Sequence, residues 1–440
     1  MSRRTSAPSS SERRSERDTI FALASGRPPA AIAIVRISGP NAHEAARSLA
    51  GELPEARHAA VRGLRSSDGE LLDEALVLRF DRAASATGED VVEFHCHGGR
   101  AIIDAVLAEL GRVDGVRLAE AGEFTRRAFE NGRIDLTEAE GLADLLEAET
   151  QSQRRAALAL AEGGLRLKVE EWQARVLALS ARAEAAIDYD EEDGLGADPQ
   201  LGSNCERLAA ELRQWLERPR IEPLRDGLRV VLAGPPNSGK SSLLNVIAGS
   251  DKAIVTAIPG TTRDQIEVPL SLEGVPIILT DTAGLRDSSG TVERIGVERA
   301  RASADGADIL VWLGEPADAP EHQRLIKIHP RCDVPGRECP PPGSLAASSV
   351  TSQGVAELLA TIRDLGRSII PAEGALALNR RQADAIVAAA ELLGSVAAAP
   401  DLLIAAEALR ATRAAFDRLT GRAGVEDVLD ALFSRFCLGK

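Results

Sequence analysis

The sequence predicts a multidomain protein with an α+β N-terminal domain, a discontinuous all-α helical domain, and an inserted α/β domain of the phosphate-loop type. Three observations support this prediction. Strand and helix patterns alternate in the N-terminal part, Ala- and Leu-rich helical tracts occupy two separate regions, and a phosphate-loop motif lies between those regions. The expected parts are a tail at residues 1–17, the α+β domain at 18–135, helical segments at 136–226 and 370–440, and the phosphate-loop domain at 227–369.

Composition and charge narrow the class of protein. The chain has 440 residues, 44% hydrophobic and 27% charged, which is typical of globular proteins. Aromatic residues make up only 3%, so the cores must be built from Leu, Ala, Val and Ile, which favours helices. The formal net charge of −15 argues against a protein that coats nucleic acid with a broad basic face, although it leaves room for a local basic patch.

Cysteine usage and hydropathy predict a cytoplasmic protein that does not cross a membrane. The five cysteines form no C-x-x-C pair and no framework of a secreted domain, so we expect a reducing compartment. No apolar run approaches the length of a membrane span. Residues 1–17 lack the apolar core of a secretory signal, and Glu12 and Glu16 weigh against an organellar transit peptide, so we expect a disordered tail.

The N-terminal region offers one candidate metal site. His95-Cys96-His97 contains three potential ligands, but alternation in a strand points Cys96 away from both histidines, and no second ligand cluster is visible. We therefore favour a structural role for these residues. The strands of this region are expected at 19–23, 31–37, 75–80 and 91–97, and its helices at 41–49 and 101–110.

Several motifs of this region are specific enough to indicate a family. They are Arg36-Ile37-Ser38-Gly39-Pro40, Thr87-Gly88-Glu89-Asp90, His97-Gly98-Gly99, Gly122-Glu123-Phe124-Thr125-Arg126-Arg127-Ala128-Phe129 and Asn131-Gly132-Arg133-Ile134-Asp135-Leu136. The region resembles the N-terminal domain of the MnmE (TrmE) family of tRNA-modification GTPases. The resemblance extends, in order, over residues 18–440.

The resemblance implies a homodimer that binds a folate, 5-formyltetrahydrofolate, as one-carbon donor. It assigns the folate contacts to Arg36, Glu93 and Arg133. An acid can pair with the donor edge of a pterin, and Arg can hold a carboxylate or a carbonyl. Without the resemblance, Arg36 and Glu93 would read as ordinary charges on a strand surface. The chain departs from the family by having Ala86 in place of Tyr and Arg133 in place of Lys.

The first helical segment contains a packing stripe and an acidic turn. The spacing of Thr137 and Glu140 predicts a capping box at its start. The acidic run at 188–194 lacks the ligand spacing and central Gly of an EF-hand, so a solvated turn is favoured over a Ca²⁺ site. The stripe, which we interpret as core and not as a cofactor site, consists of Val169, Trp172, Val176, Leu179, Ala183 and Ala186.

The phosphate-loop motif runs from Gly234 to Ser241. An apolar strand at 228–233 precedes it, and a helix opens at Ser241. In this arrangement backbone N–H groups and the helix N-terminus surround a polyphosphate, and Lys240 neutralises its outer oxygens. The Ser241 hydroxyl is expected to ligate Mg²⁺.

Two later motifs make GTP the expected nucleotide. The loop at 253–264 has the character of a segment that responds to the γ-phosphate, with Thr262 as a second Mg²⁺ ligand. The strand before Asp281 then delivers Asp-Thr-Ala-Gly, in which Asp281 would hold Mg²⁺ through water and the Gly284 N–H would sense the γ-phosphate. The expected GTP contacts are Asn237, Ser238, Gly239, Lys240, Ser241, Ser242, Thr256, Ala257, Ile258, Pro259, Gly260, Thr261, Thr262, Asp281, Thr282, Ala283, Gly284 and Asp333.

Hydrolysis needs a group that Leu285 does not supply, because Leu285 stands where Ras-type enzymes carry their water-positioning Gln. The resemblance implies a K⁺ ion in the place of an arginine finger. It assigns the K⁺ ligands to the side chains of Asn237 and Thr261 and to backbone groups of Thr256 and Ile258, and it assigns activation of water to Glu293. From its sequence context alone, Glu293 is an exposed helix acid.

The base-recognition motif is altered. GTPases read guanine with N-K-x-D, in which Asp accepts from N1–H and the 2-amino group, Asn contacts the other edge, and the Lys stem covers the ring. The corresponding residues here are Pro330-Arg331-Cys332-Asp333, and Pro330 has no amide side chain. Ser348-Ser349-Val350 weakly matches the last guanine loop, S-A-K. We expect weakened affinity or selectivity for guanine, with the phosphate chemistry retained.

The C-terminus carries a further specific motif. Helices resume near Arg380, and the chain ends Phe436-Cys437-Leu438-Gly439-Lys440, like the terminal F-C-[IL]-G-K of the family. The resemblance implies that Cys437 is required for modification and that Lys440 contacts the folate. A lone Cys near a terminus is otherwise more often inert, and this ending lacks the prenylation pattern.

The resemblance as a whole implies a K⁺-stimulated GTPase that modifies the wobble uridine of certain tRNAs at C5. It would act with an FAD-dependent MnmG (GidA) partner in a heterotetramer, so that FAD enters only through the partner. A ribosome-assembly GTPase without modification chemistry is one alternative, against which Cys437 and the folate-type module argue. A degenerate family member with weakened guanine binding is the other, and the altered base motif favours testing it.

Overall fold

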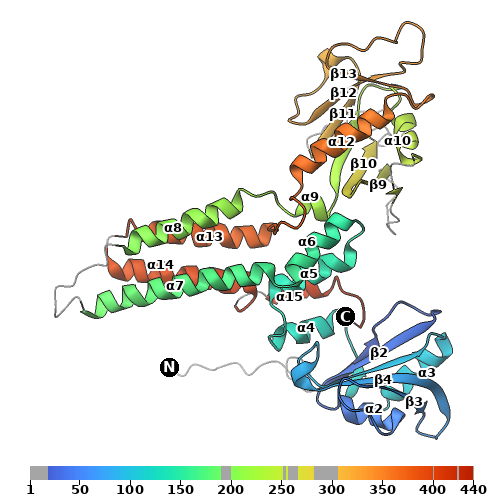
Figure 1. Ribbon diagram of the computed structural model, residues 1–440, viewed down its shortest axis with the longest axis vertical. Coiled ribbons are helices and arrows are strands. Elements are labelled where there is room, and N and C mark those ends of the chain that lie inside the picture. The colour runs from blue at the N-terminus through green and yellow to red at the C-terminus, as the bar shows by residue number, and fades with distance from the viewer. Residues whose placement is uncertain are drawn as a thin grey trace, which may run out of the picture. The chain divides into compact units, whose positions relative to one another are not determined.

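The computed structural model describes residues 18–189, 200–250, 254–255, 266–281, 306–399, 401–423 and 426–439. The chain divides into two compact units, residues 1–143 with 420–440 and residues 144–419 (Figure 1). The predicted fold class is confirmed: an α+β domain, an all-α domain made of two separate chain segments, and an α/β phosphate-loop domain inserted between those segments. None of the helices in the described parts has the length and apolar character that crossing a membrane requires.

A six-stranded sheet forms the core of the first unit, in the order β3-β4-β5-β2-β1-β6. Neighbouring strands are antiparallel except for β1 and β6, which are parallel. Val35 and Phe94 are fully buried on the face that α2 and α3 cover. The bounds are β1 Thr19–Leu23, β2 Ile32–Ser38, α2 Ala42–Ala50, β3 Ala59–Arg65, β4 Leu71–Phe80, β5 Val91–His97, α3 Arg100–Leu110 and β6 Val116–Leu118.

The opposite face of this sheet is partly open. Side chains alternate along each strand, so the residues between the buried ones point to this second face. Val61 of β3 and Leu76 of β4 are paired across the sheet and exposed, and Ile32 of β2 is exposed as well. Arg36 and Glu93 lie opposite one another in the same register, on β2 and β5. The candidate folate residues therefore belong to the open face.

Chain segments from both ends of the sequence complete the first unit. Helix α15 (Glu426–Phe433) packs against α4 (Glu123–Glu130) and the start of α5 (Leu136–Glu147). The Phe433 ring lies 6.3 Å from that of Phe129 and 6.1 Å from that of Phe436. This cluster fixes the C-terminal segment to residues some three hundred positions earlier in the chain.

The start of α5 corrects one prediction. The expected capping box was Thr137 with Glu140, but the side chain that caps the helix is that of Asp135. The Glu138 N–H donates to Asp135 Oδ1 at 2.9 Å, and Glu138 Oε2 accepts from the Asp135 N–H at 2.7 Å. Thr137 is fully buried and donates its hydroxyl to Asp135 Oδ1. The same three-residue spacing thus occurs two residues earlier, with an acid as the cap.

A helical bundle and a second sheet make up the other unit. Helices α7, α8, α13 and α14 share one core, in which Trp172 stacks on Phe416 at 6.0 Å and meets Trp215 edge-on at 5.4 Å. Of the predicted stripe, Val169, Trp172, Val176, Leu179 and Ala183 are buried, which confirms a packing role. The bounds are α6 Gln151–Ala161, α7 Gly164–Tyr189, α8 Leu201–Leu216, α9 Glu222–Arg225, α13 Arg380–Val396 and α14 Leu402–Thr420.

The phosphate-loop domain contains a seven-stranded sheet in the order β13-β12-β11-β7-β10-β9-β8. Strands β13, β12, β11, β7 and β10 are parallel, and β9 is antiparallel to both β10 and β8. The bounds are β7 Leu228–Ala233, α10 Lys240–Ala248, β8 Ile254–Val255, β9 Ile266–Leu272, β10 Val275–Asp281, β11 Ile309–Leu313, β12 Leu325–Pro330, β13 Ser344–Ala347 and α12 Val355–Ile369.

Two parallel connections of this sheet contain no α-helix. Residues 314–324 join β11 to β12 with a single 3₁₀ turn at Pro316–Asp318, and residues 331–343 join β12 to β13 without a helix. Crossovers between parallel strands usually carry a helix that anchors the loop at the strand's carboxyl end. The loop that contains the altered base motif therefore lacks the usual anchor.

Candidate functional site

The phosphate loop joins the end of β7 to the start of α10, as the motif predicts. Gly234 has φ +151, and a Cβ there would lie 2.5 Å from the Leu313 carbonyl oxygen, so only glycine fits. Gly239, the N-cap of α10, has the left-handed φ of +99. These two positions let the backbone wrap around a phosphate and aim the N-terminus of α10 at it.

Lys240 and Ser241 are held in place at the first turn of α10. Lys240 is 5% exposed, and its Nζ donates to the carbonyl oxygens of Gly234 and Pro235 at 3.0 and 2.9 Å. The Ser241 hydroxyl donates to Asp281 Oδ2 at 2.5 Å, and Asp281, at the end of β10, is 1% exposed. A hydroxyl and a carboxylate that already meet beside a phosphate loop fit a Mg²⁺ ion, which prefers oxygen ligands.

A cavity of about 250 Å³ lies beside the loop, where a base would follow the phosphates. Its walls come from the start of α10 and from the loops after β12 and β13, and they include Leu313, Pro330, Asp333 and Ser349. Of the candidate GTP contacts, Ser238, Gly239, Ser242 and Asp333 line it. Pro330 and Asp333 of the altered base motif therefore lie at a cavity beside the phosphate loop.

Arg331 connects the base motif to the phosphate loop. It adopts a left-handed φ of +60, and its Nη2 donates to the Asn237 carbonyl oxygen at 2.5 Å. Asn237 itself has a left-handed φ of +59, which Asn tolerates better than most residues. Its backbone oxygen is thereby committed to Arg331, and its side chain is exposed at the phosphate loop.

Several candidate residues lie outside the described residues. The tail at 1–17 and residues 190–194 of the acidic run lie outside them as well. The candidate residues are Thr256, Ala257, Ile258, Pro259, Gly260, Thr261, Thr262, Thr282, Ala283, Gly284, Leu285, Glu293 and Lys440.

Arg36 and Glu93 form an ion pair on the open face of the N-terminal sheet. Arg36 Nε donates to Glu93 Oε1 at 2.9 Å, and the two side chains are 26% and 15% exposed. The Arg36 guanidinium lies 5.7 Å from the ring centroid of Phe124 on α4. His95 Nε2 lies 3.3 Å from the second carboxylate oxygen, Glu93 Oε2. Sequence reasoning found the charged pair but missed Phe124 and His95 as its neighbours.

Arg133 lies beside the Thr87-Gly88-Glu89-Asp90 loop. Gly88 has φ +76, and a Cβ there would meet Arg133 Cγ at 3.2 Å. The loop is tied to β2, because the hydroxyls of Thr87 and Ser38 lie 2.7 Å apart. Arg133 therefore lies beside a loop that is tied to the end of β2, the strand that carries Arg36. The side chain of Arg133 is exposed and makes no ion pair with any described residue.

Residues of the Thr87–Asp90 and Gly122–Phe129 motifs have structural partners in this unit. Arg127, which is 4% exposed, donates to Glu89 Oε2 at 3.1 Å and to Glu123 Oε1 at 2.9 Å. Burial by itself would raise the pKa of Glu123, but hydrogen bonds, the strongest from Arg117, lower it below its usual value. These residues hold α4 against the Thr87–Asp90 loop, which lies beside the candidate folate residue Arg133.

The His95-Cys96-His97 run does not converge on a metal. Cys96 is buried on the other face of the sheet, where burial raises the pKa of its thiol to about 12. His97 Nδ1 pairs with Asp73 at 2.7 Å, a hydrogen bond that raises the pKa of His97. The two histidines contact different carboxylates and the thiol points to the other face, an arrangement that fits the structural interpretation.

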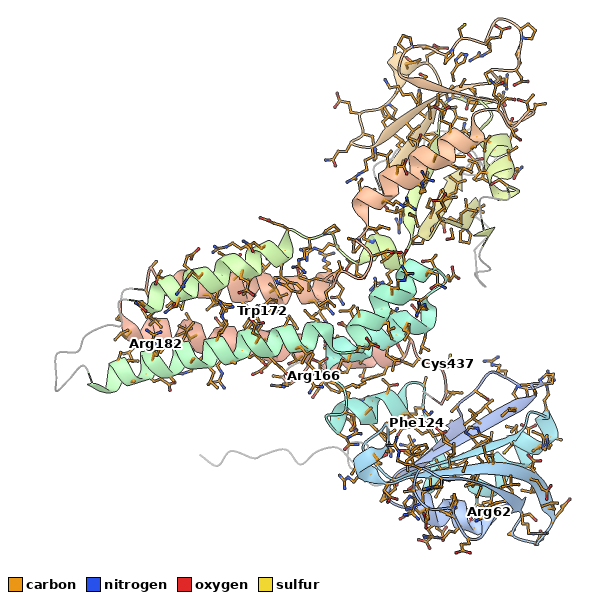
Figure 2. The ribbon with its side chains drawn as sticks, viewed as in Figure 1. Arg62, Phe124, Arg166, Trp172, Arg182 and Cys437 are labelled. Atoms are coloured by element: carbon orange, nitrogen blue, oxygen red, sulfur yellow. The ribbon has the colours of Figure 1, made fainter. Side chains whose placement is uncertain are left out.

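The C-terminal segment returns to the N-terminal sheet (Figure 2). Leu438 forms a β-bridge with Ala121, and the Gly122 N–H donates to the Cys437 carbonyl oxygen at 3.5 Å. At Gly439, φ is +91, and a Cβ would lie 2.1 Å from the Leu23 carbonyl oxygen. Leu23 and Ala22 of β1 pair with Val35 and Arg36 of β2. The exposed thiol of Cys437 is thus carried by a segment docked one strand away from Arg36.

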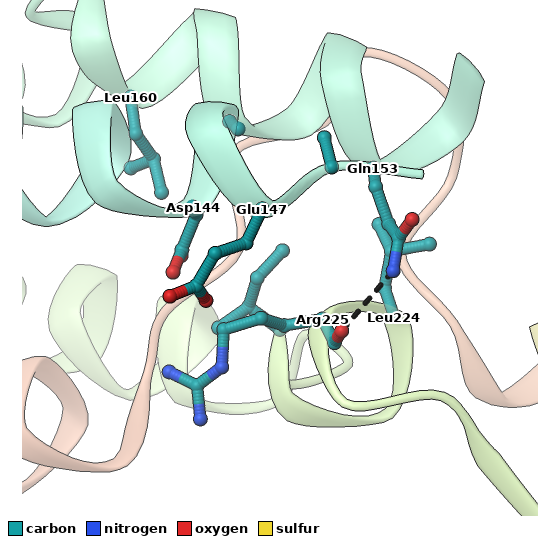
Figure 3. Close-up of a pocket in the computed structure, with 9 residues that line it drawn as sticks. Asp144, Glu147, Gln153, Leu160, Leu224 and Arg225 are labelled. Atoms are coloured by element: carbon teal, nitrogen blue, oxygen red, sulfur yellow. Dashed lines mark hydrogen bonds between the residues drawn. The ribbon is translucent and has the colours of Figure 1, made fainter. Parts of the chain in front are cut away.

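A second pocket, between α5, α6 and α9, is too small for a substrate (Figure 3). It holds about 20 Å³, which is space for a single water. Gln153 Nε2 donates to the Arg225 carbonyl oxygen at 3.1 Å, and the same side chain forms the capping box of α6 with Thr150. This pocket marks a packed junction between helices.

Comparison with known proteins identifies the family. The chain is 51% identical to the tRNA modification GTPase MnmE of Erythrobacter litoralis over 425 residues, which cover 96% of this chain and 100% of that one. The MnmE of Novosphingobium aromaticivorans is 50% identical with the same coverage. The chain belongs to the MnmE family of tRNA modification GTPases. MnmE of Brucella canis, at 42% identity over 98% of this chain, shows that the similarity extends to more distant members.

Family models match most of the chain. The model of the GTP-binding protein TrmE N-terminus matches residues 19–133, and that of the MnmE helical domain matches residues 136–437. Among solved structures, the G domain of the T. maritima FeoB iron transporter is similar over 31% of this chain and 98% of that one. Its identity of 24% and TM-score of 0.23 are too low to support an argument about function.

Proposed function

We propose that this protein hydrolyses GTP to drive the addition of a carboxymethylaminomethyl group to C5 of the wobble uridine of certain tRNAs. It would do so in the cytoplasm with an FAD-dependent MnmG-type partner. The observation that carries this proposal is the return of the C-terminal segment to the N-terminal sheet, because Gly439 packs against Leu23 of β1, the strand that neighbours the Arg36-bearing strand β2. A cysteine required for modification has to lie near the bound one-carbon donor.

The residues of the open face fit a folate. Glu93 can accept from the donor edge of a pterin, and the Arg36 guanidinium, supported on Phe124, can hold a carbonyl or carboxylate. Arg133 adds a further positive charge beside the same loop, and Lys440 is the fourth proposed contact. A bound formyl-folate supplies a one-carbon unit. The residues of this chain bind and orient it.

The nucleotide site is proposed to act as a motor. Lys240 and the N-terminus of α10 bind the phosphates, and Ser241, Thr262 and Asp281 would hold Mg²⁺. A K⁺ ion bound by Asn237, Thr256, Ile258 and Thr261 would neutralise charge that develops during hydrolysis. Glu293 would orient the attacking water, since Leu285 has no polar group with which to do so.

A homodimer is part of the proposal. Ile32, Val61 and Leu76 leave an apolar surface on the open face of the N-terminal sheet, next to Arg36 and Glu93. A second copy would cover this surface and exclude water from the proposed folate site. The two paired nucleotide domains of the dimer would then open and close as GTP is hydrolysed.

The decisive experiment is nucleoside analysis of tRNA from a deletion strain that expresses this chain. We expect the wild type to restore the modified uridine and Cys437→Ser to leave it absent. Cys339→Ser is the matched control, because Cys339 is also an exposed free cysteine but lies in the loop before β13. Restoration by Cys437→Ser would remove the thiol from the chemistry, and failure of the wild type would contradict the proposed function.

A further inference from the structure

Three potential metal ligands meet at one edge of the N-terminal sheet, away from the residues discussed so far. Phe80, the last residue of β4, pairs with Val91, the first residue of β5, so Asp81 and Asp90 are the next residues outward on the two chains. Strand β2 ends beside the same position of β5 and leads into α2, whose second residue is His43. One ring nitrogen of His43 and one oxygen of each carboxylate all lie within 4.8 Å of one another.

The distances within this cluster are too long for hydrogen bonds. His43 Nε2 lies 3.8 Å from Asp81 Oδ1, and His43 Nδ1 lies 3.7 Å from Asp90 Oδ2. A protonated imidazole that hydrogen-bonds to a carboxylate brings nitrogen and oxygen to about 2.8 Å. Two ligands that each lie about 2.1 Å from a tetrahedral Zn²⁺ are about 3.4 Å apart. The observed gaps are closer to the spacing of two ligands around one ion.

The imidazole of His43 is held without a partner. Its Nε2 is buried and forms no hydrogen bond, although the side chain as a whole is 17% exposed. A buried polar atom that is left unsatisfied lowers stability, and a metal ion at the nitrogen would satisfy it. The carboxylate of Asp90 is already oriented, because its Oδ1 accepts from the Arg82 N–H at 2.8 Å. This bond leaves Oδ2 as the oxygen that faces His43.

One cation of the protein lies beside the cluster. Arg79 contacts Asp81 Oδ1 through Nη2 at 2.9 Å and Nε at 3.0 Å. Two carboxylates against one guanidinium leave the cluster with a net negative charge, which favours a further cation. The Asp81 and Asp90 side chains are 49% and 34% exposed, so an ion can enter from solvent. Arg79 competes for Asp81, but that carboxylate has a second oxygen.

We propose that His43, Asp81 and Asp90 bind a divalent transition-metal ion of the Zn²⁺ type. One imidazole nitrogen with two carboxylate oxygens is a donor set that Zn²⁺ accepts, with water as the fourth ligand, whereas Mg²⁺ and Ca²⁺ prefer oxygen ligands alone. The ion would join the start of α2 to Asp90, the last residue of the Thr87–Asp90 loop. The backbone already links these parts, since the Gly39 N–H donates to the Asp90 carbonyl oxygen at 3.0 Å. The inference is independent of the proposed function.

The test is equilibrium dialysis of the full-length protein against Zn²⁺ in excess Mg²⁺, which fills sites made of oxygen ligands. Bound zinc is counted by atomic absorption. We expect the wild type to bind one Zn²⁺ more per chain than His43→Gln. Asp90→Asn should weaken the site at least about tenfold, since loss of an outer partner of a metal ligand alone has that effect.

His58→Gln is the matched control, because His58 is exposed and lies 4.0 Å from a single carboxylate, that of Glu55. It should bind as much zinc as the wild type. Equal zinc contents of the wild type and His43→Gln would overturn the proposal. An equal loss in His43→Gln and His58→Gln would also overturn it, because binding would then be a general property of surface histidines.

Co²⁺ bound to the wild type provides a second measurement that needs no variant to fold. The thiols of Cys339 and Cys437 are exposed and offer soft ligands elsewhere. A thiolate gives bound Co²⁺ an intense near-ultraviolet charge-transfer band, whereas a site of nitrogen and oxygen ligands gives visible d–d bands alone. We expect one equivalent of Co²⁺ with the visible bands, displaced by one equivalent of Zn²⁺. A spectrum of thiolate-bound or unbound Co²⁺ only would contradict the site.

Discussion

The phosphate end and the base end of the nucleotide site differ in how firmly their side chains are held. Lys240 and Asp281 are buried and have partners at the phosphate end. Arg331 and Asp333 are exposed at the base end, in a connection that contains no helix. The phosphate end is held by strand β7, a tight turn and helix α10. The base end is a loop that connects β12 and β13 without a helix. A substitution at the base end should therefore disturb fewer contacts than one at the phosphate end.

The largest effect is expected at the phosphate end. Lys240→Ala should lower the rate of GTP hydrolysis more than a hundredfold, because it removes the charge that neutralises the outer phosphate oxygens. Phosphate release measures the rate, and circular dichroism checks the fold. Lys327→Ala is the control: Lys327 also donates to a backbone carbonyl, that of Pro316, but lies on β12. Loss of activity in both variants would show that the effect is structural.

The base end should show an effect on selectivity that leaves the phosphate chemistry intact. Asp333→Ala should weaken GDP roughly thirtyfold and leave ADP nearly unchanged, since only guanine donates to this carboxylate. Equilibrium binding of the two nucleotides gives the ratio. Asp318→Ala, an exposed acid in the neighbouring connection, should change neither value. If Asp333→Ala preserved the preference for GDP, another residue would have to read the base.

Asn237 joins the two ends, and it should give the smallest of the three effects. Replacing Na⁺ by K⁺ should raise the GTPase rate about tenfold, and Asn237→Ala should abolish that rise without preventing nucleotide binding. Asn245→Ala is the matched control, because Asn245 is exposed on α10, away from the loop. Equal wild-type rates in the two salts would exclude a K⁺-dependent mechanism.

The phosphate loop could be predicted from sequence because its information is local. Eight consecutive residues specify the turn, the lysine and the helix start, and the strand before them is a plain apolar run. The predicted strands of the N-terminal sheet were also found, with bounds shifted by one residue at β2 and with an earlier start of β4. Strands β3 and β6 were missed, since β3 has one fully buried residue and contains Gly63, and β6 has three residues.

The surroundings of the proposed folate site could not be predicted, because they depend on distant contacts. Arg36 and Glu93 are fifty-seven positions apart on two strands, and Phe124 belongs to helix α4, so no local pattern reveals their stacking and pairing. The capping box of α5 was misassigned for a different reason. Two overlapping registers, Asp135 with Glu138 and Thr137 with Glu140, have the same spacing, and burial of Thr137 decides between them.

The docking of the C-terminal segment onto the first unit has a consequence for the order of folding during synthesis. The strands of the N-terminal sheet leave the ribosome first, but α4 and Ala121 can meet Phe433, Phe436 and Leu438 only after those later residues have been synthesised. Contacts with so large a sequence separation form slowly. The first unit is therefore begun first and finished last. Removal of residues 426–440 would take these contacts away, while the helical bundle and the phosphate-loop domain would keep all their residues.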